Sequence, residues 1–280
     1  CSTAQADDRA LRTELERVYN DWRAALLAKS VEAWKRSTSM YRQVQTRNTI
    51  ISQGRAYPDA LFDLPLRPPS VMDLKLIEVE AVGETAHLLY FGRIDLGIES
   101  AEIPENLMML KFYKEQGGWK FDTTKYINLV NNPDMRDELR SGKPEFIQHP
   151  PFNPPGIAPS VPKLCGKPEY IGALRIHAIG YEVSANLNGF DYPPVADDAE
   201  QQLAIGGYAR GPNKLVLSIK QIPMPADAEV GRHIEVQAVI SVDDPERPTK
   251  RVFRWIPQQH PQPEKVELNV VLDIATLKGV

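Results

Sequence analysis

The sequence predicts an α+β protein in which helices come first, an antiparallel sheet follows, and an all-β antiparallel sandwich forms the C-terminal part. Three observations lead to this fold class. Apolar residues recur at helical spacing near the start, β-rich runs separated by turn residues follow, and a proline-rich stretch divides the chain near its middle. At 280 residues the chain is long for one hydrophobic core, so two domains are expected.

The first helices are predicted from apolar periodicity and capping residues. One apolar face extends from about Asp7 to Ala28, with a spacing of three and four residues. Ser30 is a suitable cap for a second, short helix through Trp34, and residues 37–48 form a third helical segment. The apolar positions of the first face are Leu11, Leu15, Val18, Trp22, Ala25 and Leu26.

Strand signals follow these helices. The β-rich runs cover residues 73–83, 85–97, 106–116 and 118–129. Gly117 and Gly118 join the last two runs as a hairpin. A further helix is expected between Asn132 as its cap and Gly142 beyond its end, with a proline in its first turn. Residues 7–143 are therefore expected to form one α+β domain.

The stretch from residue 144 to residue 168 contains eight prolines. Proline fixes φ and removes a backbone donor, so neither a helix nor a central strand can run through this stretch. It is interpreted as an extended linker, because no clean repeat supports a polyproline ligand.

Residues 169–280 carry strand signals only. Turn signals at Asn188-Gly189, 211–213 and 243–245 separate the runs, which is typical of an antiparallel β-sandwich. The strand-like runs are residues 170–190, 199–210, 213–223, 232–244, 250–258 and 264–275.

Composition and motifs exclude several function classes. The net charge is −4 and evenly spread, so no nucleic-acid partner is predicted. No apolar run approaches the ~20 residues that span a bilayer. The sequence contains no phosphate-binding loop and no G-x-S-x-G elbow. His177, His233 and His260 lie far apart in the sequence without metal-ligand spacing, so no metal and no cofactor are predicted.

The runs "LERVYNDWRAALLAKSVEAW" and "KFYKEQGGWKF" give the N-terminal part a recognisable pattern. Over roughly residues 7–130 it resembles the nuclear-transport-factor-2-like (cystatin-like) superfamily, with its first helices and its terminal hairpin. The resemblance implies a cone of helices on a curved antiparallel sheet, with a pocket at the open end. The superfamily includes ketosteroid isomerase and dehydratases as well as non-catalytic binding modules, so fold alone leaves function open.

Candidate ligand-binding residues follow from this pocket. Alternation places His87 on one strand face with Leu89 and Phe91, and Tyr90 on the opposite face. Asp95 and Asp122 are further candidates for a base. Tyr41 and Tyr90 could donate hydrogen bonds. The segment after the helices holds Arg47, Arg55 and Tyr57, which could line the pocket mouth and hold an anionic ligand. None of these positions matches an isomerase motif, so no catalytic residue is assigned.

Cys1 is followed by the polar residues "STAQADD", as in bacterial lipoproteins, in which a lipid is attached to an N-terminal cysteine. An arbitrary chain start would give the same first residue. The leading hypothesis is a non-enzymatic envelope protein, lipidated at Cys1, with its domains in the periplasm or at the cell surface. Its two modules would bind a small ligand or a protein partner.

Two alternatives stay open. One is an isomerase, dehydratase or hydrolase that acts on a small apolar substrate in the N-terminal cone. The other is a sandwich that binds glycans through the aromatic residues Tyr192, Tyr208 and Trp255.

Overall fold

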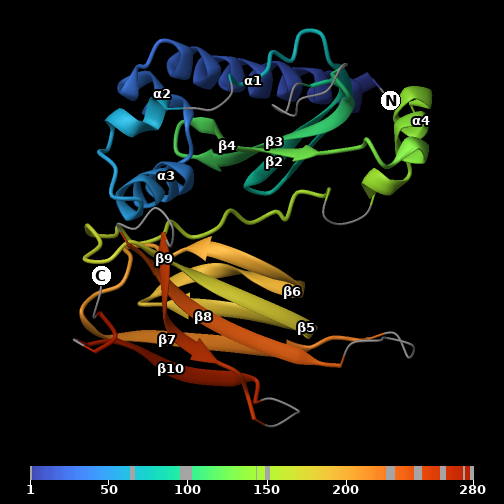
Figure 1. Ribbon diagram of the computed structural model, residues 1–280. Coiled ribbons are helices and arrows are strands. Elements are labelled where there is room, and N and C mark those ends of the chain that lie inside the picture. The colour runs from blue at the N-terminus through green and yellow to red at the C-terminus, as the bar shows by residue number, and fades with distance from the viewer. Residues whose placement is uncertain are drawn as a thin grey trace. The chain divides into compact units, whose positions relative to one another are not determined.

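Within the part of the chain that the structure describes, the protein is α+β, with four α-helices and two antiparallel sheets (Figure 1). The chain divides into two compact units. Unit 1 contains Cys1–Gln45 and Leu61–Val161, and unit 2 contains Thr46–Ala60 and Pro162–Val280. The computed structural model describes residues 2–63, 67–94, 103–142, 144–148, 152–224, 231–242, 248–258, 263–273 and 275–277, without the side chains of residues 2–7.

The second and fourth helices lie close to where their capping residues predict, whereas the first begins at Ser2, earlier than the predicted start near Asp7. The backbone N–H of Ala33 donates to Ser30 Oγ over 3.3 Å, which confirms Ser30 as the cap of α2. The last helix begins at Pro133 and ends at Ser141, followed by Gly142, whose φ of 79° is left-handed. The predicted cap Asn132 lies at the N-cap position but makes no side-chain capping bond. The helices are α1 (Ser2–Leu27), α2 (Val31–Ser37), α3 (Met40–Ser52) and α4 (Pro133–Ser141), with short 3₁₀ turns at Asp59–Phe62 and Phe146–Gln148.

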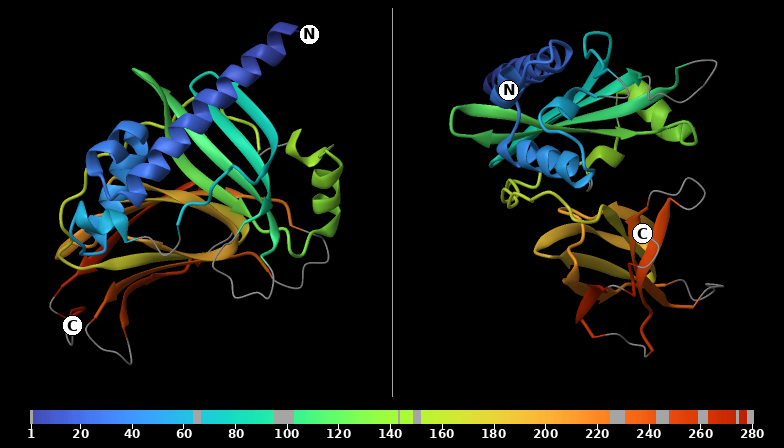
Figure 2. Two further views of the ribbon diagram at one scale, coloured as in Figure 1. Left: turned by 90° about the horizontal axis from the view of Figure 1, so that it is seen from above. Right: turned by 60° about the vertical axis from the view of Figure 1, so that its left-hand side comes forward.

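The sheet of unit 1 is a four-stranded antiparallel meander in the order β1-β2-β3-β4. Glu115 pairs with Gly118 across a two-residue turn, so the predicted hairpin between the last two strands is confirmed. Helix α1 lies across this sheet (Figure 2). The strands are β1 (Lys75–Val82), β2 (Thr85–Arg93), β3 (Glu105–Glu115) and β4 (Gly118–Ile127).

Both faces of this sheet carry apolar side chains and both are covered. On one face, Leu88, Leu110 and Phe112 pack in a core cluster with Leu15 and Tyr19 of α1. The alternate positions form a second cluster on the other face, where α4 and the segment after it supply the covering side chains. The second cluster contains Leu89, Phe91, Leu107, Met109, Leu129, Leu139, Ile147 and Phe152.

Unit 2 contains one six-stranded antiparallel sheet in the order β10-β7-β5-β8-β9, with β6 paired to β5. The predicted strands are thus present, but they belong to one hydrogen-bonded sheet instead of the two separate sheets of a sandwich. The strands are β5 (Gly172–Leu187), β6 (Phe190–Leu203), β7 (Gly211–Gln221), β8 (His233–Ser241), β9 (Thr249–Trp255) and β10 (Lys265–Leu272).

The sheet curves round on itself because β5 changes partner along its length. Residues 172–179 pair with β8, residues 181–187 pair with β7, and β6 follows the other edge. Gly180 lies at the change, with a φ of 71°, and a Cβ there would lie 2.4 Å from Met224 Sδ. The two arms of the sheet enclose one hydrophobic core, and β9 and β10 come into contact, so the sheet is nearly barrel-like (Figure 2).

Strand β6 starts nine residues earlier than the sequence pattern indicates, at Phe190 instead of residue 199. It includes Pro193 and Pro194, which cannot donate to a ladder. Both are tolerated because β6 pairs with β5 only, which leaves its other edge free of ladder bonds among the described strands.

Candidate functional site

The six predicted ligand-binding residues do not converge on one site. In unit 1, Tyr90 lies on the sheet face covered by α1 and donates a 2.5 Å hydrogen bond to Glu16 Oε1. His87 lies on the opposite face, as alternation predicts, and Tyr41 lies on α3. Tyr90 and His87 therefore lie on opposite faces of the sheet.

The other three residues belong to unit 2. Arg47 donates to the carbonyl oxygen of Cys165 over 3.0 Å, so its guanidinium is hydrogen-bonded to the backbone of this unit. Arg55 is exposed and Tyr57 is half-buried in the same segment. The predicted pocket mouth thus lies in a different compact unit from His87 and Tyr90. Of the remaining candidates, Cys1 and Asp95 lie outside the described residues.

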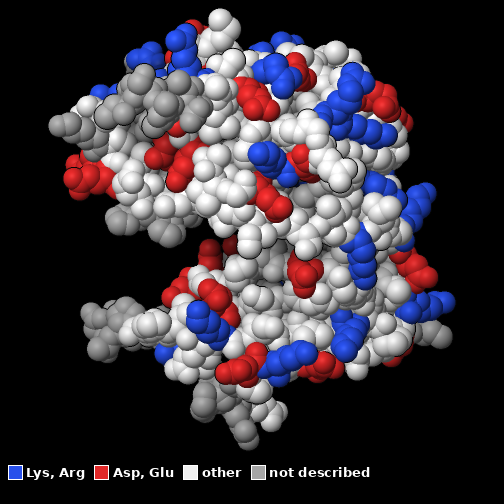
Figure 3. Space-filling view, turned by 180° about the vertical axis from the view of Figure 1, so that it is seen from behind, with Lys and Arg blue, Asp and Glu red and all other residues white. Residues whose placement is uncertain are grey.

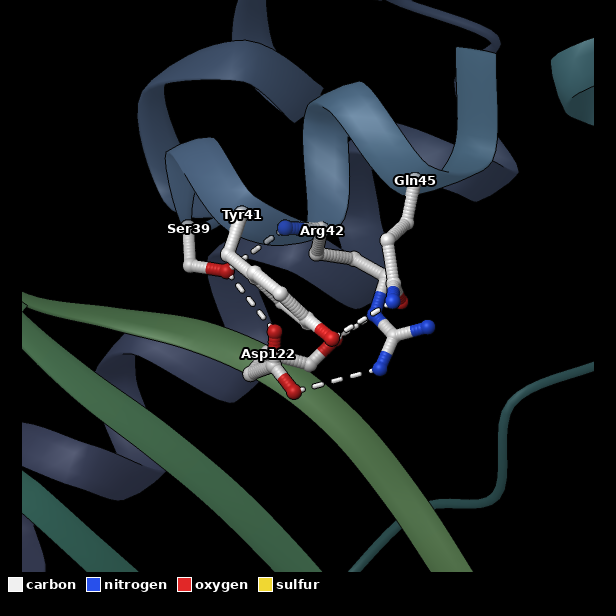
Figure 4. A network of polar contacts seen from close by, with 5 residues as sticks. All are labelled: Ser39, Tyr41, Arg42, Gln45 and Asp122. Carbon is white, nitrogen blue, oxygen red and sulfur yellow. Dashed lines mark hydrogen bonds and ion pairs between the residues drawn. The ribbon is translucent and has the colours of Figure 1, made fainter. Parts of the chain in front are cut away.

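Asp122, one of the candidate bases, is the centre of a buried polar network (Figure 4). It is 2% exposed on β4, and its two carboxylate oxygens accept from Ser39 Oγ at 2.8 Å and from Arg42 Nη2 at 3.1 Å. Arg42 Nε also donates to the Asp122 carbonyl oxygen over 2.9 Å. Ser39 Oγ in turn accepts from the Arg42 backbone N–H at 3.1 Å, so the same hydroxyl caps the start of α3.

Two tyrosines border this network and stay protonated at neutral pH. Burial raises the pKa of Tyr113, and the negative charge of Asp122 raises it further. Burial also raises the pKa of Tyr41, whose ring meets that of Tyr113 edge-on and whose hydroxyl accepts from Gln45 Nε2 at 2.6 Å. A buried carboxylate beside a tyrosine is what an isomerase site would need. Here Arg42 and Ser39 donate hydrogen bonds to both oxygens of that carboxylate. The network therefore acts as a clamp that joins the start of α3 to β4 by hydrogen bonds.

A second polar feature crosses the same sheet face as a row of paired residues. Strand register places Glu80 opposite His87, His87 opposite Lys111, and Lys111 opposite Thr123. His87 is 2% exposed, and its Nε2 lies 2.9 Å from Glu78 Oε2. Burial, followed by the nearby charge of Lys125, lowers the pKa of Lys111. The row therefore brings acidic, imidazole and ammonium groups together at one end of an otherwise apolar face.

Sequence reasoning named His87 but missed its partners Glu78 and Glu80. A signal was present in "EVEAVGETAHLL", because Gly83 and Glu84 form a two-residue turn between two strand runs. Such a turn pairs Val82 with Thr85 and hence Glu80 with His87. The sequence analysis also placed the three histidines of the C-terminal part far apart, and one of them, His260, lies outside the described residues. The register of β5 and β8 brings the rings of His177 and His233 to 5.1 Å.

A groove opens on the surface of unit 1 where α1, α2 and the β3–β4 hairpin meet. Its volume is about 610 Å³, and small residues form much of its lining: Ala24, Ala25, Ala28, Ser30, Ala33, Ser37 and Gly117. The charged residues that line it are Arg17, Arg36 and Lys120, with Asp21 as the one acid among them. Basic and acidic side chains are interspersed over the visible surface of the molecule, without one large basic field (Figure 3).

The aromatic residues predicted as glycan platforms pack in the hydrophobic core of unit 2 or against it. Tyr192 and Tyr208 are buried; the Tyr192 hydroxyl accepts from the Ile205 N–H at 2.7 Å, and Tyr208 donates to the Ala173 carbonyl at 3.0 Å. Burial raises the pKa of Tyr192 to about 12. Trp255 is half-buried against the core. Tyr192 and Tyr208 thus have no exposed ring face for a sugar, because the curved sheet encloses them.

Comparison with known proteins gives no match: no family model, no curated protein and no solved structure is significantly similar to the chain. Among the described residues, no helix has both the length and the apolar character needed to cross a bilayer.

Proposed function

We propose that the protein is a non-enzymatic binding protein, and that unit 1 binds an extended acidic segment of a protein partner in the groove between α1, α2 and the β3–β4 hairpin. The observation that carries the proposal is this groove, with its lining of small residues and its excess of basic over acidic side chains. Its volume of about 610 Å³ is that of an ordinary ligand site.

The chemistry of the groove favours an acidic peptide. The small side chains of alanine and serine allow a bound backbone to lie close to α1 and α2, and Gly117 leaves room at the hairpin turn. Arg17, Arg36 and Lys120 place three positive charges beside it against the single negative charge of Asp21. Complementary charge steers such a partner to the groove and disfavours basic segments.

The interior of unit 1 supports binding over catalysis. Leucine, methionine and phenylalanine side chains cover both faces of the four-stranded sheet. An isomerase, dehydratase or hydrolase in this unit would need a substrate pocket there. Tyr90 and Asp122, two of the candidate catalytic groups, are hydrogen-bonded to neighbouring side chains. The succession of helices and an antiparallel meander supports the nuclear-transport-factor-2-like assignment, which stays a prediction. The lipid anchor and envelope location also stay predictions, since Cys1 lies outside the described residues.

The groove can be tested with a fluorescein-labelled peptide of alternating glutamate and glycine, by fluorescence anisotropy with the full chain. We expect saturable binding by the wild-type protein. Arg36→Glu should weaken it at least about tenfold, because a like charge then faces the acidic peptide.

Lys35→Glu is the matched control, because this substitution makes the same change of charge in the same exposed stretch of α2. Lys35 does not line the groove. Its affinity should stay within about twofold of wild type at physiological salt, where exposed charges are screened. Equal loss in both variants would indicate general electrostatic attraction and contradict the proposal, as would no saturable binding at all.

A further inference from the structure

A cluster of three side chains on β1 and β2 has the composition and spacing of a metal site. The ligand atoms of Glu78, Glu80 and His87 all lie within 4.8 Å of one another. Glu78 and Glu80 are two residues apart on one strand, so both point to the same face, and the hairpin register places His87 directly opposite Glu80. Because a two-residue turn sets this register, the strands hold the three groups together.

The spacing fits the coordination sphere of a divalent transition metal. Zinc binds histidine nitrogen at about 2.0–2.1 Å and carboxylate oxygen at about 2.0–2.2 Å. Two ligands at tetrahedral angles are then roughly 3.4 Å apart. The observed Nε2–Oε2 distance of 2.9 Å between His87 and Glu78 is close to this value, and the other ligand-atom distances stay within 4.8 Å, so side-chain rotation has to bring the three ligands to equal spacing around the ion.

The charges at this position also favour a cation. Two carboxylates share one strand face within 4.8 Å, and like charges so close repel each other. The His87–Glu78 hydrogen bond occupies one oxygen of one carboxylate, whereas a divalent ion would neutralise both. The imidazole nitrogen favours a transition metal over Mg²⁺ or Ca²⁺, which prefer oxygen ligands alone.

Lys111 is the neighbouring group that opposes a cation. It lies opposite His87 on β3, on the side of His87 away from Glu80. The register therefore places His87 between Lys111 and Glu80 in this row of paired residues. A substitution of Lys111 therefore measures how much its positive charge weakens metal binding. Removing the ammonium group should strengthen binding, because the three metal ligands stay in place.

We propose that Glu78, Glu80 and His87 bind one divalent transition-metal ion of the Zn²⁺ class, which fastens the edge strand β1 to β2. The ion has three protein ligands, one imidazole and two carboxylates, and a fourth position open to water. This site lies on the sheet and involves none of the residues that line the groove, so it is independent of the proposed function.

Titration calorimetry of the metal-free, untagged full chain tests the proposal. We expect one Zn²⁺ per chain, with Mg²⁺ binding far weaker. His87→Gln and Glu80→Gln should each weaken Zn²⁺ binding at least about tenfold, since each removes a ligand. Lys111→Gln should strengthen it. Glu84→Gln is the matched acidic control in the turn of the same hairpin, and it should leave the affinity unchanged.

His177→Ala controls for the histidine pair of unit 2 and should also leave the affinity unchanged. Since a variant could fail to fold, the imidazole nitrogen resonances of the wild-type protein give a second measurement, and those of His87 should shift on Zn²⁺ addition. Absence of saturable Zn²⁺ binding, equal affinity for Mg²⁺, or binding unaffected in both ligand variants would each overturn the proposal.

Discussion

At the scale of single residues, three polar side chains buried in unit 1 that suggest a site in the sequence are held by specific partners. Asp122 has Ser39 and Arg42, Tyr90 has Glu16, and His87 has Glu78. A buried polar group without a partner loses its hydration without compensation, which is why such groups are paired in folded proteins. The pairing explains why residues that suggest catalysis in the sequence are part of the framework here.

Asp122→Ala should lower the free energy of unfolding of unit 1 by about 3 kcal/mol, because it leaves Arg42 without its buried counter-ion. Urea denaturation followed by tryptophan fluorescence measures this. Trp22, Trp34 and Trp119, three of the four tryptophans, belong to unit 1, so the signal reports mainly on that unit.

Asp137→Ala is the control for this substitution. Asp137 pairs with Arg140 on α4, but its side chain is 72% exposed, and exposed ion pairs contribute little. The change should stay within about 0.5 kcal/mol. A similar loss in the two variants would mean that the Asp122 network is not the clamp described here.

At the scale of elements, local signals were enough to predict most helices and strands. The cap at Ser30, the proline and glycine at the two ends of α4, and the hairpin turns are local, since each depends on residues a few positions apart. The strand β6 was misplaced because its edge position, which permits its prolines, depends on the pairing of the whole sheet.

The loop after β6 gives a prediction for one element. Gly206 and Gly207 are neighbours with left-handed φ values of 75° and 65°. A Cβ on Gly207 would lie 2.3 Å from Pro168 Cβ and 2.4 Å from the Tyr170 carbonyl oxygen, whereas on Gly206 the nearest atom is 3.4 Å away. Gly207→Ala should therefore destabilise unit 2 by at least about 3 kcal/mol, from steric overlap added to backbone strain.

Gly206→Ala isolates the backbone contribution, because it adds the same methyl group without the overlap. A loss of about 1 kcal/mol is expected for it. Thermal unfolding followed by circular dichroism compares the two variants. Equal losses would indicate that the close approach of Pro168 and Tyr170 does not restrict this loop.

At the scale of the whole molecule, unit 2 is assembled from two separate stretches of the chain. Asn48 of α3 joins them, since its side chain accepts from the Cys165 N–H at 3.0 Å and donates to the Lys163 carbonyl at 2.9 Å. Ser52 Oγ, one turn further, accepts from the Gly206 N–H at 2.8 Å. The second half of the proline-rich stretch is thus bound by side chains of α3 within this unit.

Asn48→Ala should destabilise unit 2 by about 3 kcal/mol, because it leaves a buried N–H and a carbonyl without their partner. Hydrogen exchange of β5 and β8, measured by mass spectrometry, reports on this unit specifically. Asn269→Ala, at an exposed position on β10, should leave exchange unchanged. Unchanged protection in the Asn48 variant would contradict the assignment of α3 residues to unit 2.

The sequence by itself determined the class of the fold, the order of its helices and strands, and the face of β2 on which His87 lies. These follow from periodicity and turn chemistry, which act over a few residues. Only the tertiary structure decided which residues meet. It placed Arg47 in unit 2, joined Asn48 of α3 to Cys165, and brought the rings of His177 and His233 together. Such meetings depend on strand register and on packing between segments far apart in the chain, and no local pattern encodes them.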